Sequence, residues 1–251
     1  GRRVPTQRGR RLVGALVAIA VVVSAVCFIF GLRLLGSART AVRGNMVSAI
    51  GMGIAVVATL LGAGMDYTLI TAGVLLGGAI GAVAAARVPM TAMPEFVALF
   101  NGSGGVASLF IAWGEYQNRV DTGAALNAFG ISEIATFLAM LIGGVTFTGS
   151  LIAYGKLSER IDSKPWQFPG QQFISIAVVV LVLAAAAIFL FNPAAPVAYG
   201  IFLGAVALAL LLGVLLTIPI GGADMPVVIS LLNSYSGLAA CAAGFVIENT
   251  V

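Results

Sequence analysis

The stretch from Gln172 to Phe191, QFISIAVVVLVLAAAAIFLF, indicates the fold class of this chain. It contains no charged residue, and its length matches the roughly 20 apolar residues that an α-helix needs to cross a bilayer. Similar runs recur along the sequence. The expected spans lie at about 12–32, 45–64, 68–86, 95–117, 131–155, 172–191, 197–219 and 226–247. The sequence therefore predicts an all-α fold, a polytopic transmembrane helix bundle of about eight spans.

The composition supports a membrane protein. Of the 251 residues, 60% are hydrophobic and 9% are charged, and the mean hydropathy is +1.09. A soluble domain carries about 25% charged residues, so this chain could not cover a water-facing surface. The net charge of +4 comes from basic residues that sit between apolar runs. This placement favours membrane lipid headgroups as a partner and excludes nucleic acid.

Several kinds of active site are excluded by the residues present. The chain has no histidine, and its two cysteines, Cys27 and Cys241, fall inside apolar segments, where small core residues are expected. There is no P-loop, and no glycine-rich turn follows a strand pattern. We therefore expect no metal ligand, no cofactor-binding residue and no catalytic residue for hydride transfer within this chain.

Basic residues in the short loops predict the orientation of the spans. Seven fall on one side, which is then cytoplasmic: Arg33, Arg39, Arg43, Arg87, Lys156, Arg160 and Lys164. The opposite loops hold only Arg119. Residues 1–11 form a basic tail, with 12–251 as the membrane domain. The five arginines of the tail would lie outside and so conflict with the majority: Arg2, Arg3, Arg8, Arg10 and Arg11.

The fourth and eighth spans resemble each other. Each begins with Met-Pro, places an asparagine seven residues after the proline, and a glycine four residues further on. The asparagines, Asn101 and Asn233, are thus expected at similar depth, about 10 Å in from the cytoplasmic helix start. Two interpretations stay open. The two amides could join the helices by hydrogen bonds, or they could line a polar path.

The eighth span carries a polar stripe that favours the second interpretation. Its members recur at three- and four-residue spacing: Ser230, Asn233, Ser234, Gly237, Cys241 and Gly244. Such a face suits a narrow, wet path better than lipid. Asp224 lies at its mouth, just before Pro226. Its carboxylate could cap the helix or could take up and release protons, and spacing does not separate these roles.

Other polar residues inside spans complete the candidate set. Ser150 lies in the fifth span, where a hydroxyl can also bond back to a helix carbonyl. Glu95 and Glu133 each follow a helix start, where a carboxylate is favoured by the helix dipole. We take Asp224, Asn233, Asn101, Ser150 and Ser234 as proton-path candidates. Possible supporting residues are Glu95, Glu133, Ser230 and Ser236.

Four motifs identify a family resemblance. They are GGADMPVVISLLNSYSG at 221–237, GVTFTGSLIAYGK at 144–156 with Ser163-Lys-Pro165 following, MTAMPE at 90–95 and Arg43-Gly-Asn45. They closely resemble the beta subunit of proton-translocating NAD(P) transhydrogenase. The likeness runs from about residue 30 to the end of the chain.

The resemblance implies a redox-coupled proton pump. The family moves hydride between NAD(H) and NADP(H) in soluble domains, outside this segment, while the membrane helices conduct the proton. The partners it implies are an alpha subunit or its equivalent and a dimer of the full enzyme, in the bacterial cytoplasmic (inner) membrane. The positions of Asp224 and Asn233 belong to the family's proton path, and that of Ser150 lies on a neighbouring path helix.

The sequence departs from the family pattern at two points. Many members carry a histidine at the position of Asn101. An asparagine, unlike a histidine, cannot titrate. The proton would then pass through water held by Asn101, Asn233 and nearby hydroxyls, or use Asp224 or a residue of another subunit. The family also continues with one more span and an NADP(H)-binding domain, whereas this chain stops at Val251. We read it as truncated and expect no activity from it alone.

Two alternatives remain at this stage. A secondary transporter of a small solute would also contain paired helices with polar centres interrupted by Gly and Pro. A structural membrane scaffold fits a polar stripe with an acidic mouth poorly.

Overall fold

The fold is known from a computed structural model that describes residues 7–61 and 67–247, with side chains from residue 14 onward. Eight helices in this part are long and apolar enough to cross a membrane. The chain divides into two compact units, residues 1–83 and 84–250. The predicted all-α bundle of about eight spans is therefore confirmed.

The first unit contains a tightly packed helix pair, α1 (Gln7–Leu35) and α2 (Ala41–Leu60). A Cβ atom added to Gly44 would lie 2.8 Å from the carbonyl oxygen of Gly31, so only glycine permits this approach. The Ser24 hydroxyl donates to the Gly51 carbonyl at 2.8 Å across the same seam. The next helix, α3 (Tyr67–Arg87), has no buried residue along its length.

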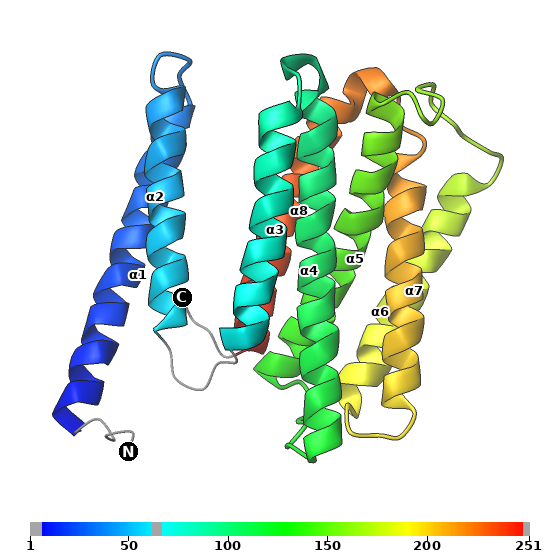
Figure 1. Cartoon of the computed structure of the whole chain (residues 1–251). Helices are drawn as coiled ribbons and strands as arrows, with labels where there is room; N and C mark the ends of the chain where they lie inside the picture. The colour runs from blue at the N-terminus through cyan, green and yellow to red at the C-terminus, as the bar shows by residue number, and fades with distance from the viewer. Residues whose placement is uncertain (1–6, 62–66, 248–251) are drawn as a thin grey trace. The chain divides into compact units, whose positions relative to one another are not determined.

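The second unit is a bundle of five long helices. They are α4 (Met93–Thr122), α5 (Ile131–Leu157), α6 (Gln171–Phe191), α7 (Ala198–Thr217) and α8 (Met225–Val246). The short 3₁₀ turns η1 (Met90–Ala92) and η2 (Gly222–Asp224) precede α4 and α8. Helix α5 is central and packs against α4, α7 and α8, while α6 packs mainly on α7 (Figure 1). The start of α8 therefore lies near the end of α5.

An aromatic cluster fixes the end of the bundle where α4 finishes. The Tyr116 ring lies 5.1 Å, centroid to centroid, from both Phe189 and Phe202, and its hydroxyl donates to the Pro193 carbonyl at 2.9 Å. Phe189 and Phe202 are fully buried. These contacts join α4, α6 and α7, and they position the α4 backbone on which Asn101 is carried.

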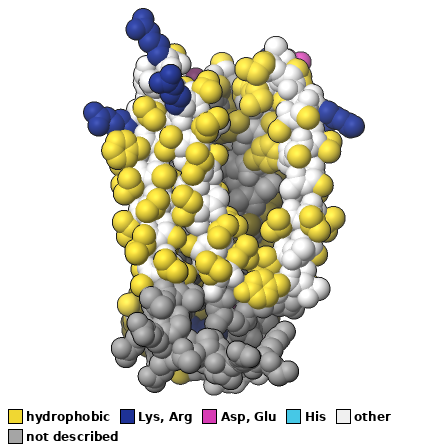
Figure 2. All heavy atoms as spheres, turned by 60° about the vertical axis from the view of Figure 1, so that its left-hand side comes forward, with side chains coloured by type: hydrophobic (Ala, Val, Ile, Leu, Met, Phe, Trp, Pro, Cys, Tyr) yellow, Lys and Arg dark blue, Asp and Glu magenta, His cyan; other side chains and the backbone are white. Residues whose placement is uncertain are grey.

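The outer faces of the helices are apolar. Hydrophobic side chains cover much of the described surface in view in Figure 2. On α6, Val180 and Leu183 are 58% and 62% exposed. A water-facing helix would carry polar groups at such positions, so these faces suit lipid.

The helix bounds differ from the predicted spans chiefly at the ends. Helix α4 continues to Thr122, beyond the apolar run, because polar residues leaving the membrane still form helix; the Gln117 amide donates to Asp121 at 2.8 Å. Gly123 then ends the helix in the left-handed region, at φ 67°. Helix α1 begins at Gln7, inside the predicted basic tail, while Arg2 and Arg3 lie outside the described residues. Residues 62–64 of the second predicted span also lie outside them.

Candidate functional site

Three of the predicted polar residues meet at one point between α4, α5 and α8. The Asn101 side-chain amide donates to the Ser150 hydroxyl at 2.9 Å, and the Ser236 hydroxyl donates to the Asn101 amide oxygen at 2.8 Å. Asn101 is 7% exposed, Ser150 is fully buried and Ser236 is half-buried. We call these three residues the polar node. The node joins three helices through side chains that are costly to bury without partners.

Small residues on α4 make the node possible. A Cβ atom added to Gly102 would lie 3.2 Å from the Ser150 Cβ, and one added to Gly104 would lie 4.0 Å from the Ser236 hydroxyl oxygen. One turn further along, Gly105 of α4 and Gly143 of α5 approach even more closely. A larger residue in this seam would hold α5 away from α4 and open the Asn101–Ser150 hydrogen bond.

The hydrogen bonds of the node share one direction. A proton is donated from α8 to α4, and another from α4 to α5. None of the three side chains changes its charge near neutral pH, because an amide and two hydroxyls are neutral donors and acceptors. The node can therefore orient a neighbouring water or stabilise a passing hydronium, but it cannot store a proton.

Asn233 is not part of this node. It is exposed on α8, so the interpretation in which the two asparagine amides join the helices does not hold; Ser236 bonds to Asn101 instead. Since Asn233 precedes Ser236 by three residues, it lies about 4.5 Å nearer the start of α8 than the level of Asn101. The two asparagines thus share a sequence pattern without sharing an environment.

The polar stripe of α8 lies on an exposed face. Ser230, Asn233, Ser234 and Cys241 are all exposed, and the Ser234 hydroxyl bonds back to the Ser230 carbonyl at 3.3 Å. The expectation that Cys241 is a core residue is therefore wrong, whereas Cys27 is partly buried; both thiols are free. The buried face of α8 carries Met225, Ile229, Leu232, Ala239, Ala243 and Val246 instead.

Asp224 directly precedes α8, at the N-cap position, without capping the helix. Its side chain is exposed and makes no cap hydrogen bond, so the capping interpretation is wrong. The physical reason is the 3₁₀ turn η2, which runs directly into α8 and leaves Asp224 with helical backbone angles, φ −92° and ψ −4°. A capping residue ordinarily has extended backbone angles. The carboxylate is thus exposed at this end of the bundle.

The two glutamates lie in first helical turns, as predicted. Glu95 is half-buried in the first turn of α4. Glu133, in the first turn of α5, is 2% exposed and forms an ion pair with Arg119 at 3.1 Å. The Asn127 backbone N–H also donates to Glu133, and Arg119 donates to the Ser132 hydroxyl and the Ala125 carbonyl. Glu133 is therefore held by an ion pair at the end of the bundle away from Asp224.

Sequence analysis missed the role of Lys156, which was expected as a loop charge. Its side chain is 1% exposed, and the ammonium donates to the carbonyl oxygens of Ile218, Ile220 and Lys164 at 2.6, 2.7 and 3.0 Å. The only hint was its place at the end of an apolar helix pattern.

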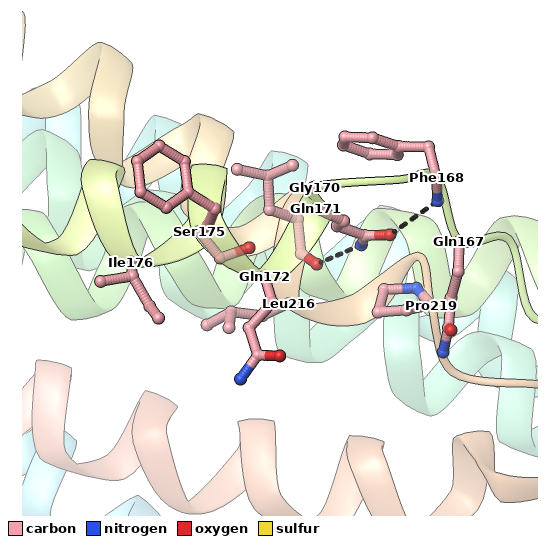
Figure 3. A pocket seen from close by; sticks show the side chains of 11 residues that line it. Gln167, Phe168, Gly170, Gln171, Gln172, Ser175, Ile176, Leu216 and Pro219 are labelled. Carbon is pink, nitrogen blue, oxygen red and sulfur yellow. Dashed lines mark hydrogen bonds between the residues drawn. The ribbon is translucent and has the colours of Figure 1, made fainter.

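A groove of about 780 Å³ opens between the start of α6 and the end of α7 (Figure 3). Inside it, the Gln171 amide donates to the Leu215 carbonyl at 3.2 Å and accepts from the Phe168 backbone N–H at 3.4 Å. Gln167, Gln172 and Ser175 line it together with apolar side chains. It contains none of the predicted site residues, so the groove is separate from the polar node.

The residues present do not fit a nicotinamide dinucleotide. Such cofactors bind where a glycine-rich turn leads from a strand into a helix. The described residues form helices and their connections, with no β-strand among them. No step of hydride transfer is therefore assigned to this part of the chain.

Comparisons with known proteins agree with the motifs. The family described as "NAD(P) transhydrogenase beta subunit" matches residues 17–251. Two relatives from Rhodospirillum rubrum, one of them from a specified strain, are described as "NAD(P) transhydrogenase subunit beta". Each is 40% identical to this chain over 240 residues, which cover 94% of this chain and 50% of the relative. The chain thus spans about half the length of these relatives, and it belongs to the NAD(P) transhydrogenase beta subunit family.

Proposed function

We propose that this chain is the proton-conducting membrane part of an NAD(P) transhydrogenase, which couples proton movement to hydride transfer between NAD(H) and NADP(H). The observation that carries this proposal is the polar node, in which the buried side chains of Asn101 and Ser150 and the half-buried Ser236 are hydrogen-bonded between three helices that are long and apolar enough to span a membrane. Buried polar groups at such a depth are costly and mark ion or proton pathways. Nothing in the fold or in the comparisons favours the solute-transporter alternative.

The path begins at Asp224 in this proposal. The carboxylate is exposed at the start of α8, at the end of the bundle where the loop charges predict the cytoplasm. From there the stripe of Asn233 and Ser234 leads along α8 toward the level of the node. A stripe of this kind is unfavourable against lipid, so we propose that helices of the remaining enzyme cover it and enclose water along it.

Asn101 acts in this path by orienting water. Its amide nitrogen donates to Ser150 and its amide oxygen accepts from Ser236, so these two hydrogen bonds fix the orientation of the amide. Unlike the histidine of many relatives, an amide does not take up the proton itself. In this proposal the proton therefore crosses this level on water, and Asp224 is the carboxylate at the mouth of the path.

We propose the wider assembly from the resemblance to the family. NAD(H) and NADP(H) bind to parts of the enzyme outside this segment, an alpha subunit or its equivalent is the partner, and the enzyme is a dimer. The location is the bacterial cytoplasmic membrane, with the chain as a multi-pass protein. One proton crossing a potential of 100 mV releases about 2.3 kcal/mol, which is enough to bias a conformational step in the NADP(H) domain.

The test uses the full polypeptide with its partner subunit in sealed vesicles. Reduction of an NADP analogue by NADH is followed together with the pH on both sides of the membrane. We expect Asp224→Asn to lower proton-coupled turnover at least about tenfold, which corresponds to about 1.4 kcal/mol. Asp121→Asn is the matched control, because Asp121 is also exposed, near the end of α4. Equal coupling in the wild type and Asp224→Asn would contradict the role of Asp224.

A further inference from the structure

The last turn of α5 places a buried cation against the ends of two helices. Lys156 lies one residue before the end of α5, and the carbonyls of Ile218 and Ile220 lie just after the end of α7. The final carbonyls of a helix lack intrahelical partners and carry the negative end of its dipole. One ammonium group therefore satisfies carbonyls at the end of α7 while standing at the negative end of α5.

The ammonium has carbonyl partners instead of a carboxylate. Its three bonds, at 2.6, 2.7 and 3.0 Å, match the three donors of an ammonium group, and the third goes to Lys164 in the α5–α6 connection. Among the described residues no carboxylate lies within 4.0 Å of it. A buried charge needs all of its donors satisfied, so these three carbonyls are held in one geometry as long as the charge is present.

The same place is fixed by a second set of bonds. The Gly222 backbone N–H donates to the Ser163 carbonyl at 2.7 Å, and the Ser163 hydroxyl donates to the Lys156 carbonyl at 2.8 Å. A Cβ atom added to Gly222 would lie 3.0 Å from the Ser163 Cβ, so the two connections are in close contact. Gly222 begins η2, whose last residue is Asp224. The Asp224 turn is thus tied to the end of α5.

We infer that Lys156 is a positioning residue that fixes the Asp224 turn relative to the polar node. Helix α5 carries both Lys156 and Ser150, six residues or about 9 Å apart along its axis. The node fixes the middle of α8 to α5 through Asn101, and the ammonium fixes the connection before α8. Because Lys156 and Ser150 belong to the same helix, these two sets of contacts fix the distance between Asp224 and the polar node along the bundle. The effect of Lys156 on proton coupling rests on the proposed function, whereas its effect on the position of the turn does not.

The primary test measures the mobility of the turn directly. A nitroxide label is placed at Ala223, which is exposed, in the full polypeptide with its partner subunit and with Cys27 and Cys241 replaced by alanine. We expect Lys156→Met, which keeps the length of the side chain and removes the charge, to sharpen the spectrum of this label. A label at Ala194, in the α6–α7 connection, should be unchanged. Lys164→Met is the matched control, because Lys164 is exposed and contributes only its carbonyl.

The functional readout separates positioning from simple loss of fold. In vesicles we expect Lys156→Met to lower the protons moved per hydride several-fold, with hydride transfer in detergent retained, and Lys156→Arg to restore part of the coupling. A label at Ala223 that is equally immobile in Lys156→Met and in the wild type would overturn the inference. If the wild type moved no protons, the proposed function would fail, but the label experiment would still show whether Lys156 fixes the Asp224 turn.

A measurement on the wild type decides the case in which Lys156→Met does not assemble. Lys156 and Lys164 are the two lysines of the chain. An amine-acylating reagent should modify Lys164 at least about tenfold faster than Lys156, since only the Lys156 ammonium is buried and fully bonded. Similar rates at the two lysines would overturn the inference.

Discussion

Gly143 of α5 and Gly105 of α4 face each other so closely that a Cβ atom added to Gly143 would lie 2.6 Å from the Gly105 carbonyl oxygen. In the reverse direction, a Cβ atom on Gly105 would lie 2.8 Å from the Gly143 carbonyl oxygen. Cβ atoms are essentially never found this close to another heavy atom. In both directions the atom that the Cβ would meet is a backbone carbonyl oxygen. This contact sets the separation of the two helices that carry Asn101 and Ser150.

Gly143→Ala should separate α4 from α5 and weaken the polar node. We expect a loss of about 1–3 kcal/mol in stability, as for other overpacked sites, seen as a lower unfolding temperature in detergent. Gly114→Ala on α4 is the control, because a Cβ atom there would meet no atom within 4 Å. An unchanged unfolding temperature in Gly143→Ala would show that the close approach is not needed.

Ser236 and Ser234 of α8 should respond differently to removal of the hydroxyl. Ser236→Ala leaves the Asn101 amide oxygen without the 2.8 Å donor, whereas Ser234→Ala removes only a bond within α8. Interhelical hydrogen bonds in membranes contribute about 0.6 kcal/mol on average and at most about 1.7. We expect Ser236→Ala to lower the unfolding temperature and Ser234→Ala to leave it unchanged. The reverse order would indicate that the node does not join α8 to α4.

The Arg119–Glu133 ion pair should stabilise the opposite end of the bundle. Arg119→Met leaves Glu133 buried without its cation, and breaking a buried pair costs about 3–5 kcal/mol. The 18% exposure of Arg119 places the expected loss at the lower end of this range. The double variant Arg119→Met with Glu133→Met should recover most of the stability. A double variant as unstable as Arg119→Met would contradict this account.

The number and approximate positions of the helices follow from the sequence, because a helix needs about 20 apolar residues to cross the hydrocarbon of a bilayer. The position of α4, for instance, is set by Pro94 at its start and Gly123 at its end. The end at Thr122 was harder to place, since polar residues continue a helix beyond the hydrocarbon.

The candidate site could be predicted only in part. Asn101 and Asn233 occupy equivalent positions of the sequence repeat. The side of α4 that carries Asn101 is buried against α5, whereas the side of α8 that carries Asn233 is exposed. Which side of a helix is buried depends on the side chains that pack across the bundle, here Ile229 and Leu232 of α8. The periodicity of the sequence does not predict this. Ser236 was found as a candidate, but its bond to Asn101 depends on a three-residue shift in register.

Lys156 shows a second limit of sequence reasoning. A lysine between an apolar helix and a polar loop is normally a solvated charge that reports orientation. Here two of the three carbonyls that bind it, those of Ile218 and Ile220, come from residues more than 60 positions later in the chain, so no local pattern reveals them. The Glu133 partner is similar, since Arg119 belongs to the preceding helix.

The most direct test of the central claim replaces the residue at the centre of the node. Asn101→Leu keeps the branching of the side chain, with bulkier methyl groups, and removes both hydrogen bonds, and Asn118→Leu, at an exposed position of the same helix, is its control. Proton uptake during reduction of an NADP analogue by NADH is measured in vesicles that hold the full polypeptide and its partner subunit. If the node lies on the proton path, uptake falls at least about tenfold in Asn101→Leu and is retained in Asn118→Leu. Wild-type uptake in Asn101→Leu would contradict the claim that the proton passes the node.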